Sequence, residues 1–134
     1  MNDDTRDADA TAEVDAVFGV LADAHRRYAL YYLRDRDCAT LDELATVLAG
    51  WLGTREDQGN VVTPADLERE QVSLRHVHLP RLVDAGFVRY DADSGEVTLE
   101  SLPELAEKVL DRSLDQRRDA SKRADRSAFD RGVG

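Results

Sequence analysis

The chain has 134 residues, of which 28 are acidic and 18 are basic, and its formal net charge is −10. This length suits one domain with a single small core, and no run of about 18 apolar residues predicts a membrane-spanning helix. The acidic N-terminus has no apolar stretch of the signal-peptide kind. The single cysteine, Cys38, excludes an internal disulfide. We therefore expect a cytoplasmic protein.

The basic residues are almost all arginine, since Lys108 and Lys122 are the only two lysines. Lysine avoidance together with many carboxylates favours adaptation to molar salt. At about 1 M salt the Debye length is roughly 3 Å, so repulsion between surface carboxylates costs little. An acidic protein that binds a basic partner is the alternative. In a halophile, a DNA-binding protein need not be basic overall.

Residues 1–11 have few apolar side chains and are expected to form a disordered acidic tail. A helical pattern begins at Glu13. Asp23 is expected to cap a further helical segment that runs to about Arg34, and the pattern leaves open whether this is one bent helix or two. The apolar positions of the first segment follow the spacing i, i+3, i+4, i+7 and are Val14, Val17, Phe18 and Leu21.

Three tyrosines, Tyr28, Tyr31 and Tyr32, accompany Leu30 and Leu33 in the second segment. The two leucines are expected in the core. The tyrosines are expected at the core edge with hydrated hydroxyl groups, or alternatively on a surface that binds a partner.

Two further helices have clear start signals. Thr40 and Glu43 form a capping box, and Cys38-Ala39-Thr40 before it is a candidate third strand. Residues 52–62 lack periodicity and predict a loop. Thr63-Pro64-Ala65-Asp66 then predicts a helix over 64–85, with Gly86 as its stop.

The helix over 64–85 has no single apolar stripe. At 100° per residue, one side carries Leu67, Leu74, Val77, Leu82 and Ala85, and nearly the opposite side carries Val72, Leu79 and Val83. Pro80 is expected to kink the helix and reset the phase between the two sets. The polar ridge between them consists of Asp66, Arg69, Ser73, His76 and Asp84.

Residues 87–90 and 96–99 predict a β-hairpin joined by the turn 91–95. Ser101, with Glu104 three residues later, is expected to cap a last helix. Residues 117–134 are predicted as a basic polar tail, either a helix extension or a loose segment, after a domain over 12–116. The apolar residues of the last helix are Leu102, Leu105, Val109 and Leu110.

Three motifs resemble those of ArsR-type winged-helix regulators, and the segment SLRHVHLPRLVDAGFVRYD looks like a family of small haloarchaeal winged-helix domains. The likeness covers about residues 14–100. The motifs are Asp23-x-x-Arg26-Arg27-x-x-Leu30-x-x-Leu33, Leu41-x-Glu43-Leu44-Ala45 and His78-Leu79-x-x-Leu82-x-x-Ala85-Gly86-Phe87-Val88.

The resemblance implies a mainly α fold with a small β-hairpin wing, namely a winged helix-turn-helix with extra N- and C-terminal helices. It further implies sequence-specific binding of double-stranded DNA, with the third helix in the major groove. The candidate contacts on that helix are Arg69, Ser73, Arg75 and His76. The two arginines are equally readable as local ion pairs with neighbouring glutamates.

Two features depart from the expected pattern. The connection from Trp51 to Pro64 is about a dozen residues, whereas a helix-turn-helix turn usually takes three or four. The wing turn, residues 91–95, has no base at its tip, and phosphate binding favours Arg or Lys there. We expect this wing to contact the DNA backbone weakly or not at all.

No metal site or cofactor is expected. His76 and His78 lie at i and i+2 and so point to different faces of a helix, and His78 is interpreted as a core or inter-helix hydrogen-bonding residue. Cys38 has no second cysteine. No phosphate loop, zinc-protease motif or nucleophile elbow is present, so we expect no enzyme.

The leading hypothesis is a dimeric DNA-binding transcriptional regulator that uses the helix over 64–85 to read DNA. The alternative is a non-catalytic protein-interaction module that keeps the fold without DNA binding. The stripes on the first and last helices are candidates for the dimer interface, or they simply close the core of the monomer. These candidates are Val14, Val17, Phe18, Leu21, Leu105, Val109 and Leu110.

Overall fold

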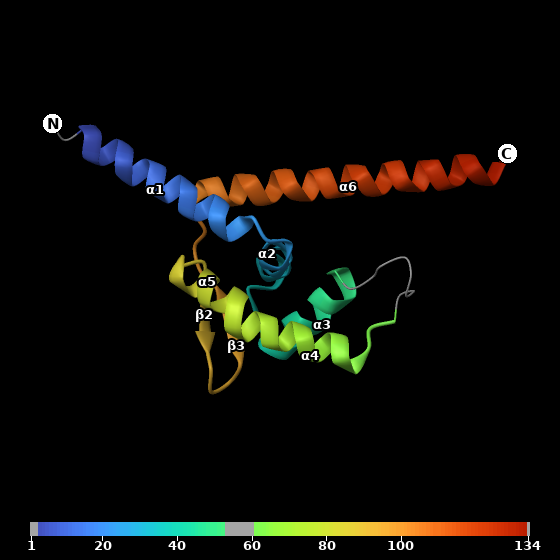
Figure 1. Cartoon of the computed structure of the whole chain (residues 1–134), viewed down its shortest axis with the longest axis horizontal. Helices are drawn as coiled ribbons and strands as arrows, with labels where there is room; N and C mark the ends of the chain where they lie inside the picture. The colour runs from blue at the N-terminus through green and yellow to red at the C-terminus, as the bar shows by residue number, and fades with distance from the viewer. Residues whose placement is uncertain (1–2, 53–60, 134) are drawn as a thin grey trace. The chain divides into compact units, whose positions relative to one another are not determined.

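The computed structural model describes residues 3–52 and 61–133 and is mainly helical, with one small three-stranded antiparallel sheet (Figure 1). The chain divides into two compact units, Met1–Leu102 and Pro103–Gly134. The elements are α1 Asp3–Leu21, α2 Ala24–Arg36, β1 Cys38–Thr40, α3 Leu41–Leu52, α4 Pro64–Ser73, the π-helical turn η2 Leu74–His78, α5 Leu79–Asp84, β2 Val88–Asp91, β3 Glu96–Leu99 and α6 Glu104–Val133.

The N-terminal helix α1 begins at Asp3, so most of the segment expected to be a disordered tail is helical. Few apolar residues there predict little packing, but Asp3 and Asp4 lie in the first turn, where negative charge favours a helix through its dipole without any packing. A break separates α1 from α2. The side chain of Asp23 accepts a hydrogen bond from the His25 backbone N–H at 2.8 Å, which confirms Asp23 as the N-cap and resolves the pattern into two helices.

The sheet has the order β1-β3-β2, with both pairings antiparallel. Val97 of the central strand lies opposite Ala39 of β1 and Tyr90 of β2. The predicted third strand over Cys38–Thr40 and the predicted hairpin are therefore confirmed. The predicted loop over 52–62 falls almost entirely on residues 53–60, which lie outside the described residues.

The core of the first unit is made largely of leucines at helical spacing. Leu30 and Leu33 of α2 are fully buried, as predicted. Burying such a side chain contributes about 2 to 3 kcal/mol. In Figure 1, α3 and α4 lie side by side below α2. The other fully buried large side chains of this unit are Leu44, Leu48, Leu74, Leu79, Leu82 and Val97.

The segments α4, η2 and α5 form one continuous helical run, called helix 64–84 below. Its start is confirmed, because Thr63 and Asp66 form both hydrogen bonds of a capping box. Its end is also confirmed: Gly86 takes a left-handed φ of 78° and its N–H donates to the carbonyl of Val83. The following N–H, that of Phe87, donates to the carbonyl of Leu82, which completes the C-terminal cap.

The π turn explains why the apolar pattern of this helix is not regular. The N–H of Leu79 donates to the carbonyl of Leu74, five residues back, so η2 takes up one extra residue. After that residue is discounted, Leu74, His78, Leu79 and Leu82 fall at i, i+3, i+4 and i+7, and all four are buried. The expected phase reset before Pro80 thus takes the form of a π turn.

Grouping Val77 with Leu74 was wrong, and so was placing Leu79 opposite Leu74. Val77 is 47% exposed, whereas Leu79 is buried beside Leu74. The uniform 100° rotation behind that grouping does not hold across a π turn, since each residue there advances by a smaller angle.

The second unit consists of α6, which continues to Val133. The segment 117–133 is therefore a helix extension, one of the two alternatives. The helix begins at Glu104 and not directly after Ser101, because a residue that precedes proline, here Leu102, disfavours helical φ/ψ. No helix within the described ranges is long and apolar enough to cross a membrane.

Candidate nucleic-acid interface and a buried histidine cluster

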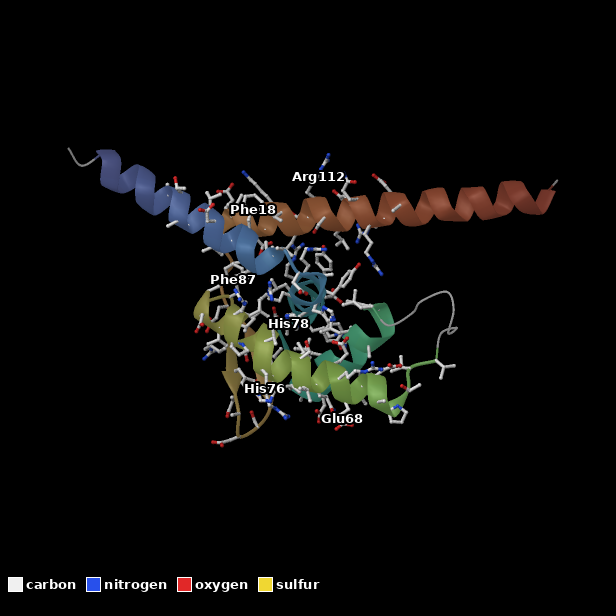
Figure 2. All side chains as sticks on the ribbon, in the orientation of Figure 1. Phe18, Glu68, His76, His78, Phe87 and Arg112 are labelled. Carbon is white, nitrogen blue, oxygen red and sulfur yellow. The ribbon has the colours of Figure 1, made fainter. Side chains whose placement is uncertain are left out.

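Helix 64–84 exposes the side opposite to its buried leucines. Arg69, Arg75 and His76 are exposed and Ser73 is half-buried, so all four predicted contact residues are accessible to a ligand. Figure 2 shows His76 and His78 on opposite sides of the helix, with His78 facing α2. The i, i+2 argument that separated the two histidines is confirmed.

Arg69 forms an ion pair with Asp66 one turn earlier, at 2.5 Å. Its guanidinium also donates to the carbonyl of Ala65. The Arg69 side chain is 76% exposed, and an exposed pair of this kind contributes at most about 1 kcal/mol. The pairing therefore holds Arg69 only weakly, and the guanidinium remains available to a stronger acceptor.

An open apolar groove of about 490 Å³ runs along the same side of the helix. Val72 and Val77 supply its apolar part and are 48% and 47% exposed. Arg69, Ser73 and His76 line its polar part. The exposed side of helix 64–84 thus alternates hydrogen-bonding groups with aliphatic side chains.

Arg75 occupies a separate position, between helix 64–84 and the turn of the β2–β3 hairpin. It lines an open hollow of about 320 Å³ together with Asp42 at the start of α3 and Asp93 of the hairpin turn. Two carboxylates in the same hollow surround this arginine with negative charge. Arg75 is therefore electrostatically less accessible to an anion than its exposure alone implies.

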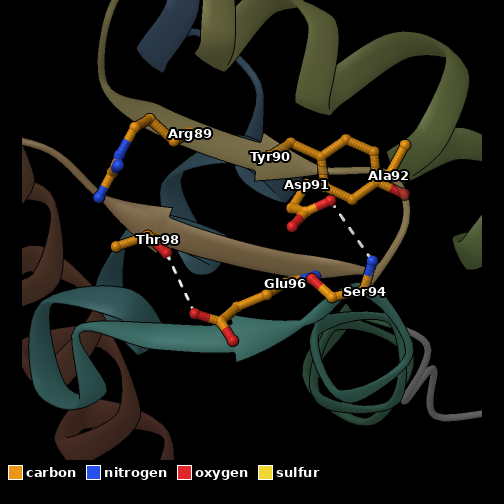
Figure 3. Close-up of a pocket in the computed structure, with 7 residues that line it drawn as sticks. All are labelled: Arg89, Tyr90, Asp91, Ala92, Ser94, Glu96 and Thr98. Carbon is orange, nitrogen blue, oxygen red and sulfur yellow. Dashed lines mark hydrogen bonds between the residues drawn. The ribbon is translucent and has the colours of Figure 1, made fainter.

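The hairpin carries a further open hollow of about 510 Å³ on one face, shown in Figure 3. Asp91 and Glu96 line it, and the Asp91 carboxylate accepts from the backbone N–H of Ser94 at 3.4 Å. Arg89 is the one basic lining residue, and it pairs with Glu100 at 2.5 Å. The acidic character expected of the hairpin turn therefore extends over this hollow.

A group of four titratable side chains, the histidine cluster, lies between α2 and helix 64–84. It comprises Asp23, His25, Glu70 and His78. The imidazole of His25 places Nδ1 3.1 Å from Asp23 Oδ1 and Nε2 3.2 Å from Glu70 Oε1. The rings of His25 and His78 are stacked, with centroids 4.9 Å apart and planes 8° from parallel. Segments 45 or more residues apart thus meet here.

Arg26 joins this cluster to the end of α1. Its guanidinium donates to the carbonyl oxygens of Gly19 and Val20 and lies 3.2 Å from Nδ1 of His78. The side chain is buried. Since an arginine has no acceptor, Nδ1 of His78 must accept this hydrogen bond, which leaves the proton of a neutral imidazole on Nε2.

The electrostatics of the cluster follow from burial and mutual proximity. Burial lowers the pKa of His78, and His25 and Arg26 lower it further, while Asp23 opposes them. Burial alone raises the pKa of Asp23, but the backbone N–H of His25 and the nearby His78 and His25 outweigh it and hold that pKa below the ordinary value. At neutral pH His78 is neutral and Asp23 is charged.

The tyrosines lie at the edge of the core. Tyr28, Tyr31 and Tyr32 are all half-buried. Tyr28 and Tyr32 each pack edge-on against the ring of Trp51, and the Tyr32 hydroxyl donates to Glu43. The predicted position of the three tyrosine rings at the core edge is confirmed.

The predicted dimer candidates differ in exposure. On α1, Val17 and Leu21 are each only 3% exposed, whereas Val14 is 40% and Phe18 is 51% exposed. The first two are thus already buried within the protomer. On α6, Leu110 is buried, and Leu105 and Val109 are half-buried.

Sequence reasoning missed the histidine cluster. It weighed His76 and His78 with Cys38, whereas the structure brings His78 together with His25 and Asp23. The one local signal that pointed to His25 was its position two residues after the N-cap Asp23, which allows the two side chains to meet. The partner on helix 64–84 is fixed by tertiary packing, which local spacing does not encode.

These features define a small, mainly helical protein with a three-stranded antiparallel sheet, an exposed helix face and a partly buried polar cluster. Residues 18–98 match the model of a domain of unknown function, DUF7344. The match spans more than half of the chain, which therefore belongs to that family. It includes helix 64–84 and all four residues of the histidine cluster. Neither a curated protein nor a solved structure gives a match.

Proposed function

We propose that this protein is a DNA-binding transcriptional regulator of a halophilic archaeon, with a winged helix-turn-helix in which helix 64–84 is the recognition helix. The observation that carries the proposal is the exposed face of this helix. Arg69, Ser73 and His76 lie beside Val72 and Val77 along one groove. The major groove presents hydrogen-bonding base edges next to thymine methyl groups, and this face offers groups for both.

The order of the elements supports the same proposal. Three helices, α2, α3 and helix 64–84, are followed by the β2–β3 hairpin, and β1 completes the sheet. This is the order that the resemblance to ArsR-type regulators implies, with the hairpin as the wing.

The mixed polar and apolar face also suits DNA recognition at high salt. Each phosphate contact loses a factor of about 8 in affinity for a tenfold rise in salt concentration, so six contacts lose about 10⁵. A protein that reads DNA in molar salt gains more from base edges and thymine methyl groups than from phosphates. The acidic wing, with Asp91, Asp93 and Glu96 exposed, then costs little affinity, and we propose that the wing does not hold the backbone.

The test is selection of bound sequences from a random duplex library in 2 M potassium chloride, followed by shift assays. His76→Ala combined with Arg69→Ala is expected to lower affinity for the selected sequence at least tenfold. Arg89→Ala, an exposed arginine on the wing, is the matched control and is expected to bind normally. No enrichment, or equal behaviour of the two proteins, contradicts the proposal.

We propose further that the regulator is a homodimer and that α1 contributes exposed apolar residues, chiefly Val14 and Phe18, to the interface. Phe18 is 51% exposed in the protomer. Light scattering in 2 M potassium chloride tests this: Phe18→Glu is expected to convert a dimer of about 30 kDa to a monomer. A wild-type monomer of 14.9 kDa contradicts it.

A protein-interaction module is the second candidate, and the charge of the first unit favours it. Residues 1–102 contain 21 acidic and ten basic residues, and phosphate binding normally requires the opposite balance. On this alternative the acidic face meets a basic protein. Two results together favour this candidate over the regulator. DNA selection in molar salt fails, and a basic protein binds saturably to the wild type but not to the variant with both Asp91→Asn and Asp93→Asn.

A further inference from the structure

Asp23, His25 and His78 bring one potential metal-ligand atom each to within 4.8 Å of one another. Two imidazoles and a carboxylate are a donor set that suits Zn²⁺ and related transition metal ions. His78 is buried, and Asp23 and His25 are half-buried. This partial burial distinguishes the group from exposed acidic residues, which commonly lie close together without an ion.

Glu70 adds an independent observation. Its Oε1 contacts His25, while its Oε2 is buried and has no hydrogen-bond partner within the described part of the chain. A buried carboxylate oxygen without a partner costs about 1 to 3 kcal/mol or more. A cation bound beside His25 relieves this cost, because Oε2 then either binds the cation directly or accepts a hydrogen bond from a water bound to it.

The hydrogen bonds of His25 also favour a cation in the cluster. Both of its ring nitrogens face carboxylate oxygens, Asp23 on one side and Glu70 on the other. Charged carboxylates only accept hydrogen bonds, and a neutral imidazole donates only one. One of the two contacts therefore lacks its proton unless a second proton or a metal ion occupies that side of the ring.

From these contacts we propose that Asp23, His25 and His78 bind a divalent transition metal ion, with Zn²⁺ as the best match, and that Glu70 supports the site. The site is distinct from the exposed face of helix 64–84, and it does not depend on DNA binding. It joins the start of α2 to the buried side of that helix.

Zinc binding requires the side chains of the cluster to rearrange. Ligands of tetrahedral zinc lie about 3.4 Å apart, given zinc–nitrogen bonds of about 2.0 to 2.1 Å, so donors that now lie up to 4.8 Å apart must close by up to about 1.4 Å. Two stacked parallel rings do not aim both lone pairs at one point. The half-buried His25 ring must therefore turn. Binding of the ion by Nε2 of His78 also requires the Nε2 proton to move to Nδ1, so the hydrogen bond from Arg26 to Nδ1 must break.

The charge balance permits a cation despite Arg26. Asp23 and Glu70 contribute two negative charges and Arg26 contributes one positive charge, so the cluster is net negative with both imidazoles neutral. Arg26 lowers the affinity for the ion, both through its charge and because its hydrogen bond to Nδ1 of His78 must break when Nε2 binds the ion.

The test is titration of Zn²⁺ alone against a chromogenic chelator, with thermal melting as a second readout. The full chain is used on a Cys38→Ser background, because Cys38 is an exposed free thiol that binds zinc by itself. All proteins share one molar-salt buffer, so complexation of zinc by the salt anion affects each equally. The parent protein is expected to bind one equivalent and to melt at a higher temperature with zinc.

The three histidines of the chain provide a matched comparison. His25→Ala is expected to weaken zinc binding at least tenfold and to abolish the rise in melting temperature, whereas His76→Ala, an exposed histidine outside the cluster, leaves both unchanged. Asp23→Asn is also expected to weaken binding, and asparagine retains the helix cap, so loss of folding does not explain that result.

Binding without saturation at one equivalent overturns the proposal, because it indicates general attraction of zinc to the acidic surface. Equal affinity of His25→Ala and the parent protein overturns it as well, as does an equal loss in His76→Ala. Since the titration contains no DNA, a failed DNA selection leaves this result unaffected.

Discussion

The guanidinium of Arg26 lies 3.2 Å from Nδ1 of His78, across 52 positions of sequence. The same guanidinium donates to the carbonyl oxygens of Gly19 and Val20 at the end of α1. One buried arginine therefore closes the end of α1 and ties α2 to helix 64–84.

Replacing Arg26 with alanine is expected to destabilise the fold by about 3 kcal/mol. The substitution leaves two carbonyl oxygens and an imidazole nitrogen without a donor, at about 1 to 3 kcal/mol for each group that stays buried. Arg26→Lys keeps the charge but loses the forked geometry, so it rescues only part of the loss. Urea unfolding in 2 M potassium chloride measures the effect. Arg89→Ala serves as the control, and equal losses in the two proteins contradict this role of Arg26.

The π turn predicts opposite tolerances for two neighbouring residues of helix 64–84. Val77→Asp is expected to change the free energy of unfolding by no more than about 0.5 kcal/mol, because Val77 is exposed. Leu79→Ala is expected to cost about 2 to 5 kcal/mol, because it leaves a cavity in the core. Thermal and urea unfolding give both values. A larger loss for the Val77 variant indicates a regular helix without the π turn.

Gly86 and Gly50 provide a paired test of backbone conformation. Gly86 has a φ of 78°, whereas Gly50 lies within α3. A Cβ at either position meets no atom within 4 Å, so conformation alone decides the outcome. Gly86→Ala is expected to cost about 1 kcal/mol, and Gly50→Ala to gain roughly 0.4 to 1 kcal/mol. Melting temperatures that shift in the same direction contradict the assigned end of helix 64–84.

The capping box of α4 predicts a dependence of stability on pH. Hydrogen bonds from the Thr63 backbone and side chain, and then the nearby Arg69, lower the pKa of Asp66 below its ordinary value of 3.8. A depressed pKa in the folded state contributes stability that is fully present above the unfolded value and is lost as pH falls through the folded value.

The measurement compares wild type with Asp66→Asn in urea at pH 7 and at pH 3. The difference in stability between them is expected to shrink at pH 3, since the carboxylate of wild type is then becoming protonated. Thr63→Ala is expected to cost about 1 kcal/mol at pH 7 and to weaken this pH dependence. A difference that is the same at both pH values contradicts the role of the charged Asp66 in the cap.

Local signals in the sequence were sufficient for the starts of α2, α3 and α4 and for the end of helix 64–84. The caps at Asp23, Thr40 and Thr63 and the stop at Gly86 depend on hydrogen bonds within four residues. Such contacts are encoded by residue type and spacing alone. The strand at Cys38–Thr40 and the hairpin followed from composition and turn residues in the same way.

The sequence by itself also determined the chemistry of the surface: the arginines and histidine on the exposed side of helix 64–84 and the carboxylates on the hairpin turn. Tertiary structure decided which apolar residues of that helix are buried, and they come from both predicted sets: Leu74 and Leu82 from one, and Leu79 from the other. These three leucines share one buried side because the π turn takes up one extra residue. A fixed rotation per residue does not predict this arrangement.

Tertiary structure also decided the partner of His78. Spacing along the chain separated His78 from His76, which lies on the opposite side of the helix, but indicated no partner for it. Packing of α2 against helix 64–84 instead places His25 and Asp23 beside it. Contacts over 45 to 52 residues depend on how helices pack, and neither helix encodes the position of the other in its own residues.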